Sequence, residues 1–580
     1  DYLYEYMKNM SYYKMNDFQI HLNDNELEMS LFDSIEDAIE NGHAGFRMES
    51  DIVGENGVPL TSEDAYYTKA EFHQFISDAS DYGMEIVPEF DTPGHALSMV
   101  KVRPDLYYKG EIVNGKPPEE AAAMLDLSHP DTLPFIKSIY NEYLDGENPV
   151  FQDSTIHIGS DEYYGGAEEY RAYVDDMLKF IRDEKDRTVR LWGSLTNKSG
   201  ETPVTSEDVQ MQVWNTGWAN PNQMLDEGFD IINIDDAQIY IVPRAGYYYD
   251  RLNPEHLYQN YEPNRFSNGT VVDESNPQFL GAMFALWNDK VGQLENGITQ
   301  YDMFDRTFEA IPAIAQKTWG SSTDLSYEEF EKVLEQTGYA AGTNPAFDIE
   351  TADSTVVDYD FTKGSEDQSE NGYDVEEEMN AAIIEGEGLE LRGGESYVTT
   401  GLSELGPSAA MEVTLTLEDT EGIQVIAEKS NDATYADRSY QNYGTIYAVD
   451  ENGYVGYDFG NLSYSFDHKL TPGEETTLTF VTDVEKTRLL VDGEEIPLLE
   501  ETKMPYNTLV LPLERIGSAT DSLNGVITSF HVNKGKYVDP TIIDPETMNI
   551  SASSEELEQG NTSMEGPIEL AFDGKLDTFW

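Results

Sequence analysis

Short apolar runs alternate with amphipathic stretches over the first 325 or so residues of the chain. Apolar and β-branched runs predict strands at 17–22, 84–90, 150–158, 190–192, 209–214, 231–234 and 280–286. Between the strands, apolar residues recur at helical spacing, as at positions 72, 75, 76 and 79. This spacing predicts helices at 68–83, 134–144, 168–185 and 301–319.

Repeated strand–helix units imply a parallel sheet, and their number favours an α/β TIM (β/α)8 barrel over an open sheet. Only seven strands are convincing, and the chain opens in what looks like the first helix. We therefore expect a barrel over residues 1–325 that lacks its first strand, in a chain that looks cut at both ends. Such a barrel would leave two neighbouring strands unpaired and its core open.

The pattern changes after about residue 350, where helical periodicity gives way to short alternating strands. Runs at 358–361, 389–394, 489–493 and 523–532, with the turn signals Asp492-Gly493 and Asn524-Gly525, predict an all-β jelly-roll sandwich. The predicted sandwich spans 353–537, after a linker at 326–352. A third module is expected at 545–580, which is too short to fold alone.

Composition narrows the class of protein. The chain carries 112 acidic and 35 basic residues, for a formal charge of −77, which argues against binding to nucleic acid or to an anionic membrane. No apolar run approaches the length of a membrane span. The absence of cysteine excludes disulfides, Cys-zinc sites and thiol catalysis. These features favour a secreted or cell-surface bacterial protein, although no signal peptide is visible in this chain.

The most informative stretch is His157-Ile158-Gly159-Ser160-Asp161-Glu162, in which two adjacent carboxylates follow an apolar run. A regular strand cannot present both on one face, so we expect them just past the strand's end, in a shared pocket. There one acid can stay protonated beside a charged neighbour, as glycoside hydrolysis requires. The alternative is a solvated Asp-Glu step, which is common in so acidic a chain.

Other predicted strands also end in residues suited to a sugar pocket. Catalytic groups of such barrels lie at the carboxyl ends of strands, where acids and aromatic rings can bind a sugar ring. Each Trp taken alone would more often be a core residue, but three at strand ends favour a pocket. The ends are 21–25 with Asp24, 89–95 with His95, then Trp192, Trp214, Tyr240, and Trp287-Asn288-Asp289.

With these stretches in this order, residues 1–325 resemble the catalytic barrel of glycoside hydrolase family 20, which comprises β-N-acetylhexosaminidases and lacto-N-biosidases. The matching stretches are 14–24, 66–69, 85–95 and 157–162. The sandwich resembles the laminin G/concanavalin A-like lectin family. Asn549 to Ser553, with 571–580, resembles the start of a discoidin-type (F5/8 type C) carbohydrate-binding module.

The resemblance implies retaining, substrate-assisted catalysis, in which the 2-acetamido oxygen of the substrate attacks the anomeric carbon and forms an oxazolinium ion. Glu162 would be the general acid and then the base, with a pKa that burial and the Asp161 charge raise. Asp161 would stay ionised and orient the acetamido N–H, and Tyr240 would donate to the acetamido oxygen. Trp192, Trp214 and Trp287 would enclose the acetyl group, and Asp24 and His95 would support the acid.

Two departures from the family pattern bear on the substrate. The last strand carries Trp287-Asn288-Asp289 where single-sugar enzymes usually have Trp-x-Glu, and Val242 stands where they usually have Asp. Both departures remove side-chain contacts to the outer hydroxyls of the bound sugar ring. This leaves room for a second sugar attached at O3. Tyr247, Tyr248 and Tyr249 could stack that sugar or could pack the loop.

Three functions remain open at this point. The favoured one is a lacto-N-biosidase-like enzyme that releases Galβ1-3GlcNAc from type-1 glycans such as those of milk and mucins. The alternatives are a β-N-acetylhexosaminidase that releases single GlcNAc or GalNAc, and a catalytically weak carbohydrate-binding protein. We expect no cofactor and no metal in the barrel, an oligosaccharide or glycoprotein glycan as partner, and no nucleic-acid or membrane partner. The sequence leaves the oligomeric state and calcium binding by the sandwich open.

Overall fold

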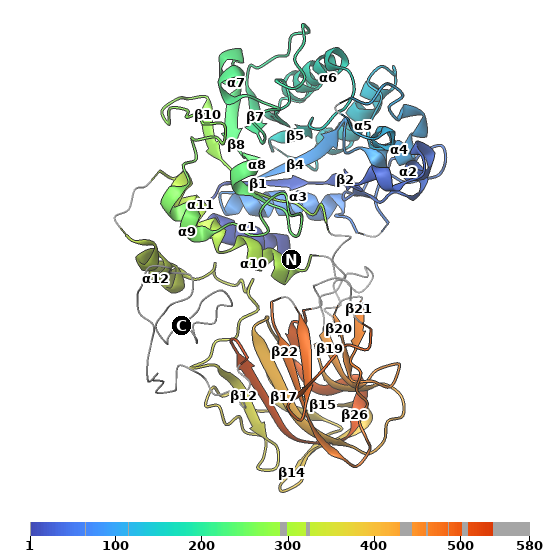
Figure 1. The fold of residues 1–580 in the computed structure, drawn as a ribbon, viewed down its shortest axis with the longest axis vertical. Helices are drawn as coiled ribbons and strands as arrows, with labels where there is room; N and C mark the ends of the chain where they lie inside the picture. The colour runs from blue at the N-terminus through green and yellow to red at the C-terminus, as the bar shows by residue number, and fades with distance from the viewer. Residues whose placement is uncertain are drawn as a thin grey trace, which may run out of the picture.

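The computed structural model describes residues 2–63, 65–113, 115–152, 154–290, 298–320, 325–429, 444–459, 462–484, 486–500 and 508–537. Its first part is a curled parallel sheet of the TIM-barrel type (Figure 1). The sheet runs in the order β1 (Asp17–His21), β4 (Glu85–Thr92), β5 (Ile156–Gly159), β6 (Val189–Trp192), β7 (Val209–Val213), β8 (Asp230–Asn233) and β10 (Phe279–Ala282).

The two edge strands of this sheet, β1 and β10, each pair with one neighbouring strand among the described residues. Residues of both edges, together with α1 (Tyr2–Tyr12), line a cavity of about 530 Å³. Trp192 and Glu89 also line it, so the cavity reaches the carboxyl ends of the central strands. The described part of the chain therefore has the seven barrel strands that the sequence predicts, with an open seam between β1 and β10.

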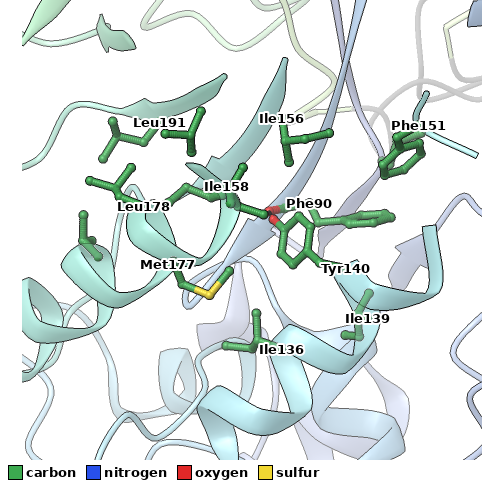
Figure 2. Close-up of a cluster of buried hydrophobic side chains, with 14 of the residues drawn as sticks. Phe90, Ile136, Ile139, Tyr140, Phe151, Ile156, Ile158, Met177, Leu178 and Leu191 are labelled. Atoms are coloured by element: carbon green, nitrogen blue, oxygen red, sulfur yellow. Dashed lines mark hydrogen bonds between the residues drawn. The ribbon is translucent and has the colours of Figure 1, made fainter. Parts of the chain in front are cut away.

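Helices cover the outer face of the sheet and bury a continuous apolar layer. A capping box between Thr68 and Glu71 starts α3 (Lys69–Asp81), and α5 (Thr132–Leu144) and α6 (Ala167–Lys179) follow β4 and β5. Figure 2 shows strand residues packed against α5 and α6. The labelled residues are Phe90, Ile156, Ile158 and Leu191 from strands, Phe151 before β5, Ile136, Ile139 and Tyr140 from α5, and Met177 and Leu178 from α6.

Shorter elements complete the barrel region. The strands are β2 (Asn23–Asn25), β3 (Ala44–Phe46), β9 (Tyr240–Ile241) and β11 (Ala285–Leu286). The helices are α2 (Ile35–Asn41), α4 (Leu97–Val102), α7 (Pro221–Glu227), α8 (Asp236–Ile239), α9 (Pro254–Asn260), α10 (Gln300–Thr307) and α11 (Ala310–Thr318). Short helices of other types are the 3-10 helices η1 (Met29–Leu31), η2 (Pro104–Leu106) and η3 (Pro118–Ala123) and the π-helix η4 (Phe180–Glu184).

Three predicted elements differ in extent from the observed ones. The strand predicted at 150–158 is only β5, because Gln152 and Ser154 donate backbone hydrogen bonds to Pro149 and Phe151 in turns. The strand predicted at 280–286 is two short strands, β10 and β11, which pair with β8 and β9. The helix predicted at 301–319 is α10 and α11. Pro312, which has no N–H for the carbonyl of Phe308, accounts for the break.

The linker predicted at 326–352 contains a helix, α12 (Tyr327–Thr337). Ser326 caps it and forms a capping box with Glu329, a signal that the linker prediction overlooked. Phe330 stacks on Tyr258 of α9 with the ring centroids 4.3 Å apart, so this helix packs on the barrel. The segment is therefore structured.

The second part of the chain is all-β and antiparallel, as predicted. Its central strand is β26 (Arg515–Lys534), which pairs with β12 (Thr355–Asp360), β15 (Gly388–Thr399), β17 (Ala409–Leu417) and β18 (Gln424–Glu428). The jelly-roll connection stays a prediction. The other strands are β13 (Glu377–Met379), β14 (Ala382–Ile384), β16 (Glu404–Leu405), β19 (Gly444–Val449), β20 (Gly456–Phe459), β21 (Leu462–Ser465), β22 (Glu475–Thr482), β23 (Thr487–Val491), β24 (Glu494–Ile496) and β25 (Leu511–Pro512).

One of the two turn signals in this region is wrong. Asp492 and Gly493, with φ of 48° and 85°, form the predicted tight turn between β23 and β24. Asn524-Gly525 instead lies inside β26, where a Cβ on Gly525 would meet the Thr416 carbonyl oxygen at 2.2 Å. This glycine allows close approach of two strands and does not form a turn.

The discoidin-like module predicted at 545–580 lies outside the described residues. In the described ranges, none of the helices combines the length and apolarity that a bilayer crossing needs.

A largely buried ion pair joins the edge strand β1 to β6, the fourth strand of the sheet. Arg190 is 2 % exposed and donates from its two terminal nitrogens to both Asp17 carboxylate oxygens, at 2.9 and 2.6 Å. Its Nε donates to Gln210 Oε1 at 2.9 Å. Because a buried guanidinium needs a compensating charge, Asp17 ties the edge strand β1 to the middle of the sheet.

We predict that Asp17→Ala lowers the free energy of unfolding by about 3 kcal/mol, since it leaves Arg190 buried without its carboxylate. Urea unfolding followed by tryptophan fluorescence measures the change. The matched control is Asp145→Ala, which breaks the pair between Lys185 and the 56 %-exposed Asp145. There we expect a loss of at most about 1 kcal/mol. Equal losses in the two variants would contradict the role given to Asp17.

Candidate active site

The acid pair lies just past the end of β5, where the backbone leaves strand geometry. Gly159, Ser160 and Glu162 have φ of 67°, 89° and 41°, so the chain turns sharply around Asp161. Both residues therefore lie past the carboxyl end of β5, the end at which catalytic groups of such barrels lie. Asp161 Oδ1 is buried and has no hydrogen-bond partner among the described residues. An acceptor in that condition is prepared for a donor from a ligand.

Glu162 is held from two sides. Tyr164 OH donates to its Oε1 at 2.8 Å, and His95 Nε2 lies 3.6 Å from its Oε2. Lys116 is exposed, with its ammonium 4.7 Å from the centroid of the Tyr164 ring. The Glu162 side chain is 32 % exposed, so it is the part of the pair that an incoming substrate can reach.

Behind Glu162, two histidines alternate with two carboxylates. His95 Nδ1 lies 2.9 Å from Asp24 Oδ1, and Asp24 Oδ2 lies 3.0 Å from His21 Nε2. His21 Nδ1 in turn lies 3.1 Å from Oε1 of Glu89, whose carboxylate is fully buried. This charge network, defined as Asp24, His21, His95 and Glu89, joins residues of β1, β2, β4 and the turn after β4.

The charge network holds its histidines in the protonated form. Burial lowers the pKa of His95, but Asp24 and Asp91 outweigh burial and raise it well above its usual range. Burial likewise lowers the pKa of His21, and Glu89 and Asp24 raise it. Burial raises the pKa of Asp24, and the two histidines lower it strongly.

The pKa of Glu162 shifts in the direction opposite to the predicted one. Burial raises the pKa of Glu162, as expected, but the hydrogen bond and positive charge of His95, followed by Lys116 and Tyr164, lower it to about 2. Burial raises the pKa of Asp161. The prediction of a raised Glu162 pKa is therefore wrong, because the hydrogen bond and the positive charge of His95 outweigh burial.

The three predicted tryptophans meet Tyr240 in one apolar wall. Trp192 and Trp287 ring centroids lie 5.8 Å apart, and Tyr240 and Trp287 lie 6.0 Å apart. Trp214 belongs to the same buried cluster, and so does Val242, which is 1 % exposed. Burial and then the Asp161 charge raise the pKa of Tyr240 well above its usual range, so its hydroxyl stays a donor beside that acid.

Trp192 also has a polar contact that fixes its orientation. Its indole Nε1 donates to Glu89 Oε1 at 2.6 Å, and Gln19 Nε2 donates to Glu89 Oε2 at 2.7 Å. The sequence reading did not single out Glu89 as a site residue. The signal was available, since Glu89 is the last acid before the 91–95 turn on the strand that delivers His95.

At the outer rim of the site, Asp289 contacts the loop that carries Tyr247, Tyr248 and Tyr249. Tyr247 OH donates to Asp289 Oδ2 at 2.7 Å, and the Tyr247 ring is 52 % exposed. Tyr248 OH donates to Asp236 Oδ2 at 2.8 Å, and its ring lies 5.5 Å from that of Tyr240. Burial raises the pKa of Asp289. The rim therefore offers an aromatic face and a carboxylate just outside the tryptophan wall.

All nine predicted site residues lie at this end of the barrel. The fold also brings in residues that the sequence reading missed, namely Glu89, Asp91, Tyr164 and Lys116. Histidines that are scattered in the sequence meet carboxylates here, with one ligand atom each of His21, Glu89 and Asp91, and of Asp91, His95 and Asp161, within 4.8 Å. Because His21 already contacts Asp24 and Glu89, and His95 contacts Asp24 and Glu162, these groups have the pattern of a proton network.

The catalytic-domain model of glycosyl hydrolase family 20 matches residues 1–169 and 165–322. These ranges cover more than half of the 580-residue chain, which therefore belongs to this family. The barrel therefore corresponds to the catalytic domain of a glycosyl hydrolase family.

Among curated relatives, the chain is 24 % identical over 320 residues to a lacto-N-biosidase of Bifidobacterium bifidum, covering 51 % of this chain and 26 % of the relative. It is 23 % identical over 410 residues to a beta-hexosaminidase of Vibrio vulnificus, covering 57 % and 46 %. A beta-hexosaminidase of Emericella nidulans is 24 % identical over 238 residues, covering 34 % and 39 %. The chain thus spans less than half the length of each of these relatives.

Two solved structures are also similar to the chain. A beta-N-acetylhexosaminidase of Bacteroides fragilis has a TM-score of 0.44 and 22 % identity over 60 % of this chain and 71 % of that one. Dispersin B has a TM-score of 0.39 and 16 % identity, over 55 % of this chain and 95 % of its own.

We predict that Glu89→Gln destabilises the fold in a pH-dependent way. Burial raises the pKa of Glu89, and His157, His21 and Gln19 outweigh burial and lower it to about 2. A carboxyl whose pKa is lower when folded stabilises the protein above its unfolded pKa of about 4.3 and loses that contribution as pH falls toward 2. The variant should therefore lose about 3 kcal/mol of unfolding free energy at pH 7, and less as pH falls below 4.

Urea unfolding of both proteins between pH 7 and pH 3 measures this difference. Glu85→Gln is the matched control, because Glu85 lies on the same strand, is exposed, and accepts from the Thr155 N–H at 2.8 Å. The control should unfold like the wild type at every pH. A Glu89→Gln deficit that is constant with pH would refute the charge assignment.

Proposed function

We propose that the protein is a retaining, exo-acting glycoside hydrolase that uses the substrate's own 2-acetamido group as nucleophile and releases Galβ1-3GlcNAc. The observation that carries the proposal is the unpartnered, buried Asp161 Oδ1 beside the wall of Trp192, Trp287 and Tyr240. An apolar recess with one hydrogen-bond acceptor and one phenol donor matches an acetamido group, which has a methyl, an N–H and a carbonyl oxygen.

In this proposal Asp161 accepts the acetamido N–H and Tyr240 donates to the acetamido oxygen, which aims that oxygen at the anomeric carbon. The indole rings of Trp192 and Trp287 hold the methyl group and restrict rotation of the acetamido plane. As the oxazolinium ion forms, the negative charge of Asp161 stabilises the positive charge that develops on it.

Glu162 transfers the proton. His95 lowers the pKa of Glu162, so Glu162 is ionised and His95 holds the proton. His95 Nε2 lies 3.6 Å from Glu162 Oε2, close enough for the proton to move between them when the side chains adjust. When the sugar excludes water, this proton passes from His95 to Glu162 and then to the leaving glycosidic oxygen. Glu162 next removes a proton from the water that opens the oxazolinium ring and returns it to His95, whose restored positive charge Asp24 stabilises.

The release of a disaccharide is supported by the rim. Val242 puts an apolar wall where a carboxylate would grip a terminal sugar, and Asp289 is drawn toward Tyr247 at the outer edge. The exposed Tyr247 ring and Asp289 together offer stacking and hydrogen bonding to a galactose. The relative from Bifidobacterium bifidum is named a lacto-N-biosidase, which agrees with this choice. Release of a single GlcNAc or GalNAc is the second candidate, since other relatives are named beta-hexosaminidases.

For the whole protein, we propose a secreted or cell-surface enzyme whose sandwich resembles laminin G/concanavalin A-like lectins and holds glycan substrates near the barrel. The cysteine-free, acidic composition supports this location.

We expect the protein to release nitrophenol from the nitrophenyl β-glycoside of lacto-N-biose, and little from that of GlcNAc. A thiazoline derived from the preferred sugar should inhibit competitively, because it mimics the oxazolinium ion. Steady-state kinetics on the two glycosides decides the substrate. Release from the GlcNAc glycoside alone would replace the first candidate by the second, and lack of thiazoline inhibition would remove the acetamido mechanism.

We predict that Tyr247→Ala lowers kcat/KM on the lacto-N-biose glycoside by about tenfold, since a stacked ring contributes about 1–1.5 kcal/mol. Any residual turnover of the GlcNAc glycoside should stay unchanged. The matched control is Tyr249→Ala, because Tyr249 is 48 % exposed on the same loop and donates to the Ala237 carbonyl. A loss of similar size in the control would show that loop packing, and not stacking, explains the effect.

A further inference from the structure

Asp91 is a buried acid at the carboxyl end of β4 to which no role has yet been given. It is 1 % exposed, and its Oδ1 accepts the Ser160 N–H at 3.1 Å. One carboxylate oxygen of Asp91 and one of Asp161 lie within 4.8 Å of each other and of a His95 nitrogen. Asp91 therefore lies directly behind the acid that faces the acetamido recess.

The backbone around Asp91 is shaped to keep this contact close. A Cβ on Gly159 would lie 1.8 Å from Asp91 Oδ1, so only glycine lets the end of β5 approach the acid. Asn23 holds Asp91 from the other side, with its Oδ1 accepting the Asp91 N–H at 2.8 Å and its Nδ2 donating to the Asp91 carbonyl at 3.0 Å. The carboxyl group has little freedom to turn away from Asp161.

Two carboxyl groups can share a hydrogen bond only if one of them carries a proton. The groups around Asp91 oppose a second negative charge, because Glu89 on the same strand and Asp161 are acidic neighbours. His95 and His21 supply positive charge, which Asp24 and Glu89 already compensate. The remaining titratable neighbours are the phenols of Tyr140 on α5 and of Tyr170 and Tyr173 on α6. A buried pair in these surroundings keeps one proton between its two acids.

We propose that Asp91 is a positioning residue that retains this proton, donates it in a hydrogen bond to Asp161, and so keeps Asp161 ionised and fixed in orientation for the acetamido N–H. This deepens the proposed function and rests on the role given there to Asp161. The proton stays on Asp91 throughout the reaction cycle, and only the charge of Asp161 faces the substrate.

The location of the proton follows from the two environments. Asp91 is enclosed by protein, and one of its oxygens already accepts from Ser160, which leaves the other to donate. Oδ1 of Asp161 has no hydrogen-bond partner among the described residues, so this carboxylate still has an oxygen that can accept a donor. Burial favours the neutral form of the enclosed Asp91. The proposed reaction needs the charged form of Asp161, so the proton belongs on Asp91.

Infrared difference spectroscopy at neutral pH tests this assignment without any substrate. The carbonyl-stretching band of a protonated carboxyl group should disappear in Asp91→Asn and persist in Asp161→Asn, because the asparagine at 91 can donate to Asp161 but has no acid proton. The reverse result, with the band lost only in Asp161→Asn, would overturn the proposal. So would a band unchanged in both variants, since neither acid would then hold the proton.

Kinetics on whichever glycoside the wild type hydrolyses adds a second readout. Asp91→Asn should keep kcat within about tenfold of the wild type, and Asp91→Ala should lose about a hundredfold or more, as when a preorganised donor is removed. Equal losses in both variants, at wild-type thermal stability, would contradict a donor role. A wild type that hydrolyses neither glycoside would refute the proposed function while leaving the infrared result to decide the place of the proton.

Discussion

The catalytic end of this barrel depends on burying several carboxylates close together, with the imidazoles of His21, His95 and His157 beside them. Glu89 is fully buried. Asp24 lies between His21 and His95 and contacts both, and Glu162 lies beside His95. Because an uncompensated buried charge costs several kcal/mol, each of these side chains restricts the protonation of the next. The orientation of Trp192 through Glu89, and the charge of Glu162 through His95, are consequences of that restriction.

Much of the fold can be predicted from the sequence. Parallel strands that are buried on both faces appear as apolar runs, and the helices that cover them appear as amphipathic stretches. The misjudged boundaries have local causes. Pro312 accounts for a break in a helix that periodicity made continuous, and the Ser326 capping box started a helix inside a supposed linker. Gly525 looked like a turn residue because sequence alone does not show the strand that lies against it.

The sequence predicts which residues form much of the site, but it does not predict their protonation states. Asp161, Glu162, Tyr240 and the tryptophans follow strand ends, and strand ends of a parallel barrel meet at one face. The protonation of Glu162 depended instead on His95 and Lys116, which are far from it in sequence. Residue spacing carries no information on such long-range electrostatics. Asp91 was missed for the same reason, since only the fold places it behind Asp161.

The buried amide of Asn9 has a practical consequence for dividing this chain into independent parts. Its Oδ1 accepts the Ala340 N–H and its Nδ2 donates to Thr343 Oγ1, both at 2.9 Å, while Tyr13 OH donates to the Gly338 carbonyl at 2.6 Å. A protein expressed only to the last barrel helix would leave these polar groups of the first helix unmatched inside an apolar surface. The natural point of excision for an autonomous catalytic unit therefore falls beyond the segment that follows α12.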